Sequence, residues 1–426
     1  MLLITNGTIV DPVQGIYKGD ILIRDGKIAK IADKIEQTEL KEETESLRII
    51  DAAGKKIGPG LVDVHVHFRD PGFTHKEDIE TGARAAAAGG FTTVVLMANT
   101  KPCVDQVETL QYVLDKGDQT GIHIHSCANV TKGMAGQELV PMEQLSEAGA
   151  VGFTDDGVPI LSENMVRKAM EQAALCRKPI SFHEEDPKYI QNNGIHAGKA
   201  AAYYGIGGSK REAEITMIER DIRLALETGA TVVIQHISTK EGVELVRQGK
   251  AAGADVHAEA TPHHFTLTEE AAIEKGTLAK MNPPLREEVD RQAIIEGLAD
   301  GTIDLIATDH APHSKEEKEK PLTEAPSGII GLETALSLGI RELVQTGKLT
   351  YPQLVQRMST APCTLYGLRG GTLREGDPAD LVIFDPEEIW KVQQFASKSA
   401  NSPFIGEELP GVVHATICGG KFVYQK

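Results

Sequence analysis

Short apolar segments alternate with longer amphipathic segments through the middle of this chain. The apolar segments have the length of buried strands, and the stretches between them are rich in helix formers. The predicted strands are Leu61–His67, Phe91–Met97, Ile122–Cys127, Val151–Thr154, Ile180–His183, Val232–His236, Asp255–Glu259 and Ile303–Asp309. The predicted helices include Ile79–Ala88, Asn164–Ala174, Ile215–Glu227 and Lys240–Arg247. Eight βα units favour an α/β fold with a (β/α)8 TIM-like barrel. The first strand is not followed by a GxGxxG motif, which counts against a dinucleotide-binding sheet.

Both ends of the chain have a different pattern, which is typical of β structure. Apolar runs flank Asp25-Gly26, a strong hairpin signal, and strand-like runs return at residues 379–384 and 412–417. Chain ends often lie close together, so the two segments can complete one sheet. We therefore predict a small, discontinuous β-sandwich domain from residues 1–58 and 367–426, and a barrel domain from residues 59–366.

Composition and charge narrow the classes of function. The 426 residues carry a formal net charge of −18, which disfavours binding to nucleic acid or to anionic membranes. We find no signal peptide and no apolar run of about 18 residues. The five cysteines are odd in number and widely spaced, which is not the pattern of a disulfide framework. A cytoplasmic protein is the simplest interpretation.

The candidate chemistry lies at the ends of the predicted strands. His65 and His67 are two positions apart on one strand, so both imidazoles face the same side and can form a pair of metal ligands. This motif alone is equally typical of hydrogen-bonded core histidines.

Further titratable residues end other predicted strands: His183, His236, Asp309 and the pair Asp155 and Asp156. The carboxyl ends of barrel strands carry active sites, so together they favour a metal centre. Nitrogen and oxygen ligands without a thiolate suit zinc, and manganese or cobalt remain alternatives.

Several stretches of the chain resemble the amidohydrolase superfamily and, within it, the type I dihydroorotases. The resemblance covers nearly the whole chain. It is carried by residues 59–72, 85–99, 101–102, 282–286, 308–313 and 331–334. The resemblance implies zinc as the cofactor, with one or two ions per chain.

The resemblance also assigns the metal ligands. His65, His67 and Asp309 would bind one ion, and His183 and His236 a second. In many relatives a carboxylated lysine bridges the two ions, but residues 150–157 contain no lysine. Asp156 is therefore predicted to replace it, with Asp155 as the less favoured neighbour.

Substrate contacts follow from the same resemblance. Arg69, Asn99 and His313 correspond to a trio that holds a free carboxylate of the substrate, and the planar guanidinium suits a carboxylate well. Asn282 corresponds to a contact with the ring. Ser327 and Gly328 align with a segment that lines the pocket.

The implied reaction is the reversible closure of N-carbamoyl-L-aspartate to L-dihydroorotate, in the de novo synthesis of UMP. Asp309 is the predicted catalytic residue, because a carboxylate beside the metal can carry the proton. One alternative is another cyclic amidohydrolase: a hydantoinase, a dihydropyrimidinase or an allantoinase. The other is a non-catalytic dihydroorotase-like subunit of aspartate transcarbamoylase. A homodimer and an association with aspartate transcarbamoylase are the predicted assemblies.

Overall fold

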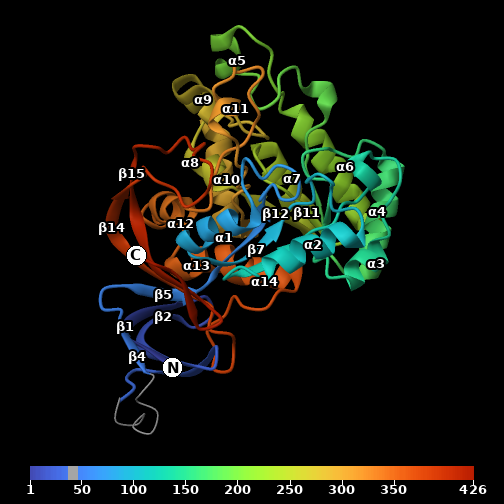
Figure 1. Ribbon diagram of the computed structural model, residues 1–426. Coiled ribbons are helices and arrows are strands. Elements are labelled where there is room, and N and C mark those ends of the chain that lie inside the picture. The colour runs from blue at the N-terminus through green and yellow to red at the C-terminus, as the bar shows by residue number, and fades with distance from the viewer. Residues whose placement is uncertain (37–46) are drawn as a thin grey trace.

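The computed structural model describes residues 1–36 and 47–426 (Figure 1). Helices surround a set of central strands in the larger part of the molecule. A smaller part, blue and red in Figure 1, contains strands from both ends of the chain, and both termini lie there. The predicted α/β class is confirmed.

A central strand lies within or overlaps each of the eight predicted strand segments. These strands form two sheets, with the orders β13-β12-β11-β10-β9 and β6-β7-β8, and each pairing within them is parallel. Their bounds are β6 (Leu61–Val66), β7 (Phe91–Leu96), β8 (His123–Ser126), β9 (Phe153–Thr154), β10 (Ile180–Phe182), β11 (Val232–Ile234), β12 (Val256–Ala260) and β13 (Leu305–Ile306). Most end earlier than predicted, so the polar residues of the motifs generally lie just beyond the strands.

The two central sheets meet through isolated bridges at both edges. Ala128, which follows β8, pairs with Phe153 of β9. At the other edge, Val66 of β6 pairs with His310, which follows β13. The main-chain N–H of His67 donates to the carbonyl of His310 at 2.8 Å. These contacts join the end of β8 to β9 and the end of β6 to the segment that follows β13.

Helices connect the central strands, and local sequence explains where they begin. Asp78 caps α1 by accepting a hydrogen bond from the Thr81 N–H, and the helix ends at Gly89. Buried alanines of α1 pack toward the central strands. The helices are α1 (Ile79–Ala88), α2 (Val107–Gly117), α3 (Met142–Glu147), α4 (Glu163–Cys176), α5 (Lys199–Tyr204), α6 (Glu212–Thr228), α7 (Lys240–Ala251), α8 (Pro262–Thr266), α9 (Glu270–Lys275), α10 (Glu288–Asp300), α11 (Lys315–Lys318), α12 (Ala335–Gly339), α13 (Tyr351–Val355) and α14 (Ala361–Tyr366). Short 3-10 or π turns are η3 (Lys132–Met134), η4 (Pro187–Tyr189), η5 (Gly276–Ala279), η6 (Ile340–Val344) and η7 (Gln356–Thr360).

Strands from the two chain ends form one sheet with its own apolar core. Within the described residues its order is β16-β15-β14-β5-β1-β2-β3, and β4 pairs with β1. The junction between the ends is antiparallel, with Ile57 opposite Ile383. The strands are β1 (Leu2–Asp11), β2 (Gly15–Arg24), β3 (Lys27–Ala32), β4 (Arg48–Asp51), β5 (Lys56–Pro59), β14 (Leu381–Lys391), β15 (Glu408–Cys418) and β16 (Lys421–Gln425). The domain boundaries and the sandwich arrangement stay predictions.

Candidate metal centre and substrate pocket

His65 and His67 lie at the end of β6, and Asp309 follows β13. The Asp309 Oδ1 atom is 2.9 Å from His67 Nε2 and 3.5 Å from His65 Nε2. All three residues are buried, and their potential ligand atoms lie within 4.8 Å of one another. The alternation of side chains along a strand explains why both imidazoles face the same carboxylate.

Asp156 follows β9 and lies among four histidines. Its Oδ1 atom is 3.5 Å from His65 Nε2, 3.6 Å from His183 Nδ1 and 3.7 Å from His236 Nε2. Its Oδ2 atom is 3.4 Å from His67 Nε2. Asp156 thus lies between the two predicted ligand groups.

The neighbouring carboxylate, Asp155, faces elsewhere. It accepts hydrogen bonds from the main-chain N–H groups of Val130 and Thr131 and from the side chain of Asn129. Asp155 therefore fixes the segment that follows β8, while Asp156 faces the histidines.

The donor set fits a divalent cation. His65 Nε2 is buried and has no hydrogen-bond partner, although two carboxylates lie near it. Four imidazoles and two carboxylates converge without a thiolate, which is a donor set that zinc accepts.

Charge within this cluster shifts the pKa values strongly. Burial opposes ionisation of Asp156 and Asp309, but the surrounding histidines hold the pKa of both carboxyls well below the ordinary value. Burial also opposes the charging of His65, yet Asp156 and Glu259 raise its pKa well above the ordinary value. The carboxylates are therefore ionised at neutral pH, as metal ligands must be.

In three of the histidines, the ring nitrogen that faces away from Asp156 and Asp309 contacts a side-chain oxygen. Glu259 Oε2 is 3.0 Å from His65 Nδ1, and Glu185 Oε2 is 3.2 Å from His183 Nε2. Asn99 Oδ1 is 3.0 Å from His67 Nδ1. Such contacts select the tautomer and orient the ring of a ligating histidine. Glu259 and Glu185 were not predicted from the sequence, although the position of Glu259 at the end of a predicted strand was a usable signal.

Three residues of this region have left-handed backbone conformations. Arg69 has φ 60°, His236 has φ 34° and Asp309 has φ 49°. Positive φ is uncommon for residues other than glycine and costs free energy, so it persists where the surrounding structure enforces it. Here it aims three side chains into one pocket.

A pocket of about 170 Å³ opens above the histidines. It brings together every predicted substrate contact and all the predicted metal ligands except the more deeply buried His65. Its lining includes His67, Arg69, Asn99, Asp156, His183, His236, Asn282, Asp309, His313, Ser327 and Gly328.

His313 is fixed within this pocket by both ring nitrogens. Its Nε2 lies 2.8 Å from the Ser327 carbonyl, and Lys76 Nζ lies 3.4 Å from its Nδ1. Burial, followed by the nearby charges of Arg69 and Lys76, lowers the pKa of His313, so the ring stays neutral. Lys76 was not predicted from the sequence.

A buried lysine, Lys318, supports the segment that His313 contacts. Lys318 Nζ donates to the carbonyls of Pro326 at 2.9 Å and Gly328 at 3.0 Å. It therefore fixes the Ser327–Gly328 segment at the edge of the pocket.

The chain is similar to known proteins along its whole length. A family profile described as dihydro-orotase-like matches residues 54–242. A protein named dihydroorotase from Clostridioides difficile (strain 630) is 54% identical over 100% of both chains. A second protein of that name, from Clostridium acetobutylicum, is 50% identical, again over 100% of both chains.

The chain belongs to the dihydroorotase family. The resemblance found in the sequence is confirmed.

Solved structures of related enzymes share the fold of this dihydroorotase-family chain. An L-hydantoinase (dihydropyrimidinase) from Arthrobacter aurescens superposes with a TM-score of 0.88 at 29% identity, covering 100% of this chain and 96% of the other. A D-hydantoinase from Thermus sp. superposes with a TM-score of 0.84 at 26% identity, covering 100% and 95%. The fold alone therefore does not separate dihydroorotases from hydantoinases, and the pocket residues must do so.

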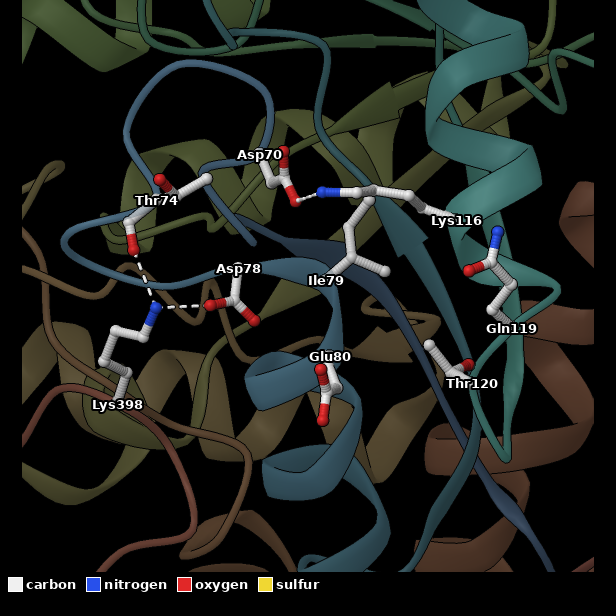
Figure 2. A pocket seen from close by; sticks show the side chains of 9 residues that line it. All are labelled: Asp70, Thr74, Asp78, Ile79, Glu80, Lys116, Gln119, Thr120 and Lys398. Atoms are coloured by element: carbon white, nitrogen blue, oxygen red, sulfur yellow. Dashed lines mark hydrogen bonds and ion pairs between the residues drawn. The ribbon is translucent and has the colours of Figure 1, made fainter.

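A separate cleft of about 490 Å³ lies beside the segment that carries Arg69 (Figure 2). Figure 2 shows Asp70 facing Lys116 and Lys398 reaching Asp78 and Thr74. Lys116 Nζ is 2.7 Å from Asp70 Oδ2, and Lys398 Nζ donates to the Thr74 carbonyl at 2.8 Å. Both lysines are thus paired, and the pairs anchor the segment between β6 and α1.

No helix in the described part of the chain combines the length and apolar character that crossing a membrane requires.

Proposed function

We propose that this chain is an active dihydroorotase, which interconverts N-carbamoyl-L-aspartate and L-dihydroorotate in the de novo synthesis of pyrimidines. The observation that carries the proposal is the shared pocket: Arg69 and His313 line it together with Asp309 and the histidine cluster. A guanidinium beside a metal centre suits a cyclic amide that bears a free carboxylate. Relatives named dihydroorotase, 54% and 50% identical along their whole length, support the same reaction.

In this proposal His65, His67 and Asp309 hold one divalent ion, and His183 and His236 hold a second. Asp156 contacts both groups, which supports its predicted role as the bridge. Zinc is the expected metal, with one or two ions per chain. A divalent ion at this place supplies Lewis acidity, which polarises a carbonyl group and eases the deprotonation of water.

Asp309 moves the proton. In hydrolysis of the ring, its carboxylate accepts a proton from the attacking water and delivers it to the departing ring nitrogen. In ring closure, the same carboxylate accepts the proton of the attacking amide nitrogen and delivers it to the hydroxyl that departs from the substrate carboxyl group as water. The surrounding histidines hold the pKa of Asp309 well below its ordinary value, so the carboxylate is ionised at neutral pH.

The remaining pocket residues position the substrate. We propose that Arg69, Asn99 and His313 hold the free carboxylate, that Asn282 contacts the ring, and that Ser327 and Gly328 line the pocket. The local positive charge of Arg69 offsets the overall acidity of the chain for an anionic substrate.

The finer architecture is part of the proposal. The bridges at Ala128–Phe153 and Val66–His310 support closure of the central strands into a (β/α)8 barrel over residues 59–366. Residues 1–58 and 367–426 would then form the small β domain. The five free cysteines suit a cytoplasmic protein. The homodimer and the association with aspartate transcarbamoylase stay predictions.

The deciding experiment combines metal analysis with a substrate panel. The purified chain should contain zinc and hydrolyse dihydroorotate, with much lower kcat/KM for hydantoin, dihydrouracil and allantoin. Preference for an uncharged ring would favour a hydantoinase, dihydropyrimidinase or allantoinase. A chain without metal and without turnover, even after zinc is supplied, would favour the non-catalytic subunit.

A further inference from the structure

Three potential metal ligands meet far from the candidate active site. His123 begins β8, Asp380 immediately precedes β14, and Cys418 ends β15. Strand β8 runs parallel to β6 and β7, and the catalytic candidates follow the carboxyl ends of the central strands. His123 occupies the opposite, amino-terminal end, where the sheet built from the chain ends contacts the central strands.

The contacts within this group are close. Asp380 Oδ2 lies 3.1 Å from His123 Nε2, and Asp380 Oδ1 accepts the Gly419 N–H at 2.7 Å. The ligand atoms of His123, Asp380 and Cys418 all lie within 4.8 Å of one another. In a tetrahedral zinc site, ligand atoms are about 3.3 to 3.8 Å apart, as Zn–S of about 2.3 Å and Zn–N of about 2.0 Å require. The His123–Asp380 pair is already near that spacing, and the Cys418 thiol would have to leave its contact with the Thr92 carbonyl, which is 3.7 Å from Sγ.

Burial and exposure give the group one open side. Asp380 is 4% exposed and Cys418 is 6% exposed, whereas the His123 side chain is 45% exposed. A cation can therefore enter beside the imidazole and keep one water molecule as its fourth ligand. The buried carboxylate supplies the negative charge that would hold it.

The electrostatics agree with this geometry. Burial, and then the Asp380 carboxylate, raise the pKa of the Cys418 thiol, so without a cation the thiol keeps its proton. Asp380 also raises the pKa of His123. A bound cation would reverse both effects, with release of the Cys418 proton and of any proton on His123 Nε2.

We propose that His123, Asp380 and Cys418 form a second metal site, which binds one zinc-class cation and links β8 to the sheet of the chain ends. Imidazole and thiolate ligands select zinc, cobalt or a similar ion rather than magnesium or calcium, which prefer oxygen. The site is independent of the proposed reaction. A structural role fits its place between β8 and the sheet of the chain ends.

Cobalt(II) is the sharpest probe, because a thiolate ligand gives an intense near-ultraviolet charge-transfer band. The candidate active site contributes only nitrogen and oxygen ligands and cannot produce this band. The full chain, stripped of metal and titrated with Co²⁺, should develop the band, and Zn²⁺ should abolish it. The Cys418→Ser variant should lack the band and bind one Co²⁺ fewer per chain.

Two further variants keep the test decisive. Cys127→Ser, which removes a different buried thiol, should retain the band. His123→Asn alters a half-exposed residue, should fold, and should weaken the Co²⁺ affinity of this site at least tenfold while leaving dihydroorotate turnover unchanged. The proposal is overturned if the wild-type chain saturates with Co²⁺ without a charge-transfer band, or if the band survives in Cys418→Ser. In that case His123 and Asp380 are only an ion pair beside a packed thiol.

Discussion

Glu259 Oε2 lies 3.0 Å from Nδ1 of His65, and both side chains are fully buried. The carboxylate accepts the Nδ1 proton, so Nε2 of His65, which faces Asp156 and Asp309, is the ring atom that would bind a metal ion. The contact therefore sets the tautomer that a metal ligand needs.

Removing the Glu259 carboxylate should weaken metal binding. We expect Glu259→Leu to lower zinc affinity by roughly 10- to 100-fold, the usual effect of losing such a partner. Glu259→Gln keeps an acceptor oxygen, so zinc affinity should fall less than in Glu259→Leu. Competition with a chromophoric chelator measures the affinity directly, and Glu333→Gln, a substitution of a largely buried glutamate outside the metal cluster, serves as the control. Unchanged affinity in Glu259→Leu would show that the contact does not orient His65.

Asp309→Asn should separate metal binding from turnover. The amide cannot carry the proton, so we expect kcat for dihydroorotate to fall by about 10²- to 10⁴-fold while part of the metal remains. Steady-state kinetics and metal content of the same preparation test both statements. Asp255 lies at the other end of the central strands, just before β12, so the control variant Asp255→Asn should keep normal kcat. Turnover near the wild-type rate in Asp309→Asn would refute the assignment.

Arg69→Lys should reduce recognition of the substrate carboxylate. A lysine keeps the charge but loses the two-pronged geometry, which costs on the order of 1.5 to 3 kcal/mol, or about a 10- to 100-fold loss in kcat/KM. The loss should appear mainly in KM. Arg84→Lys on the outer face of α1 is the matched control. An unchanged KM would indicate that Arg69 does not contact the substrate and would favour an uncharged ring.

The ion pair between Asp70 and Lys116, next to Arg69 in the chain, should affect KM indirectly. Asp70 is 1% exposed and contacts Lys116 Nζ at 2.7 Å and the Tyr112 hydroxyl at 2.9 Å. Lys116 is partly exposed, so solvent screens its loss, and we expect Lys116→Met to destabilise the fold by about 1 kcal/mol. The loosened segment should raise KM several-fold without changing metal content. Steady-state kinetics and thermal unfolding of Lys116→Met test both effects, with Arg84→Met as the control. Identical KM values in Lys116→Met and the wild type would contradict the prediction.

Stability should depend on pH through Glu333. Burial raises the pKa of its carboxyl to about 7, although the main-chain N–H groups of Ala396 and Ser397 donate to it. The unfolded carboxyl titrates near pH 4.3, so between about pH 4 and 7 the folded state binds more protons. The contribution of Glu333 to the free energy of unfolding is therefore complete at low pH and is lost as the pH rises through about 7.

Thermal unfolding tests this dependence. Between about pH 5 and pH 8, the Tm of the wild type should fall relative to that of Glu333→Gln, which has no charge to bury. Parallel Tm profiles for the two proteins would contradict the assignment.

The sequence by itself determined the eight central strands, the positions of His65, His67, His183, His236 and Asp309 near their ends, and the hairpin at Asp25-Gly26. These features depend on local rules, since alternation along a strand and the turn preference of Asp-Gly involve only neighbouring residues.

Only the tertiary structure decided which groups meet across distant strands. Asp155 and Asp156 are adjacent in sequence, yet one fixes a loop and the other faces four histidines, because the chain turns between them. Glu185 has no local signature, and the roles of Glu259 and Glu185 depend on where β12 and β10 place them beside His65 and His183. The group of His123, Asp380 and Cys418 likewise exists only because β14 and β15 return to β8. Such contacts join residues up to about 300 positions apart in the chain, and the packing of the whole fold fixes them.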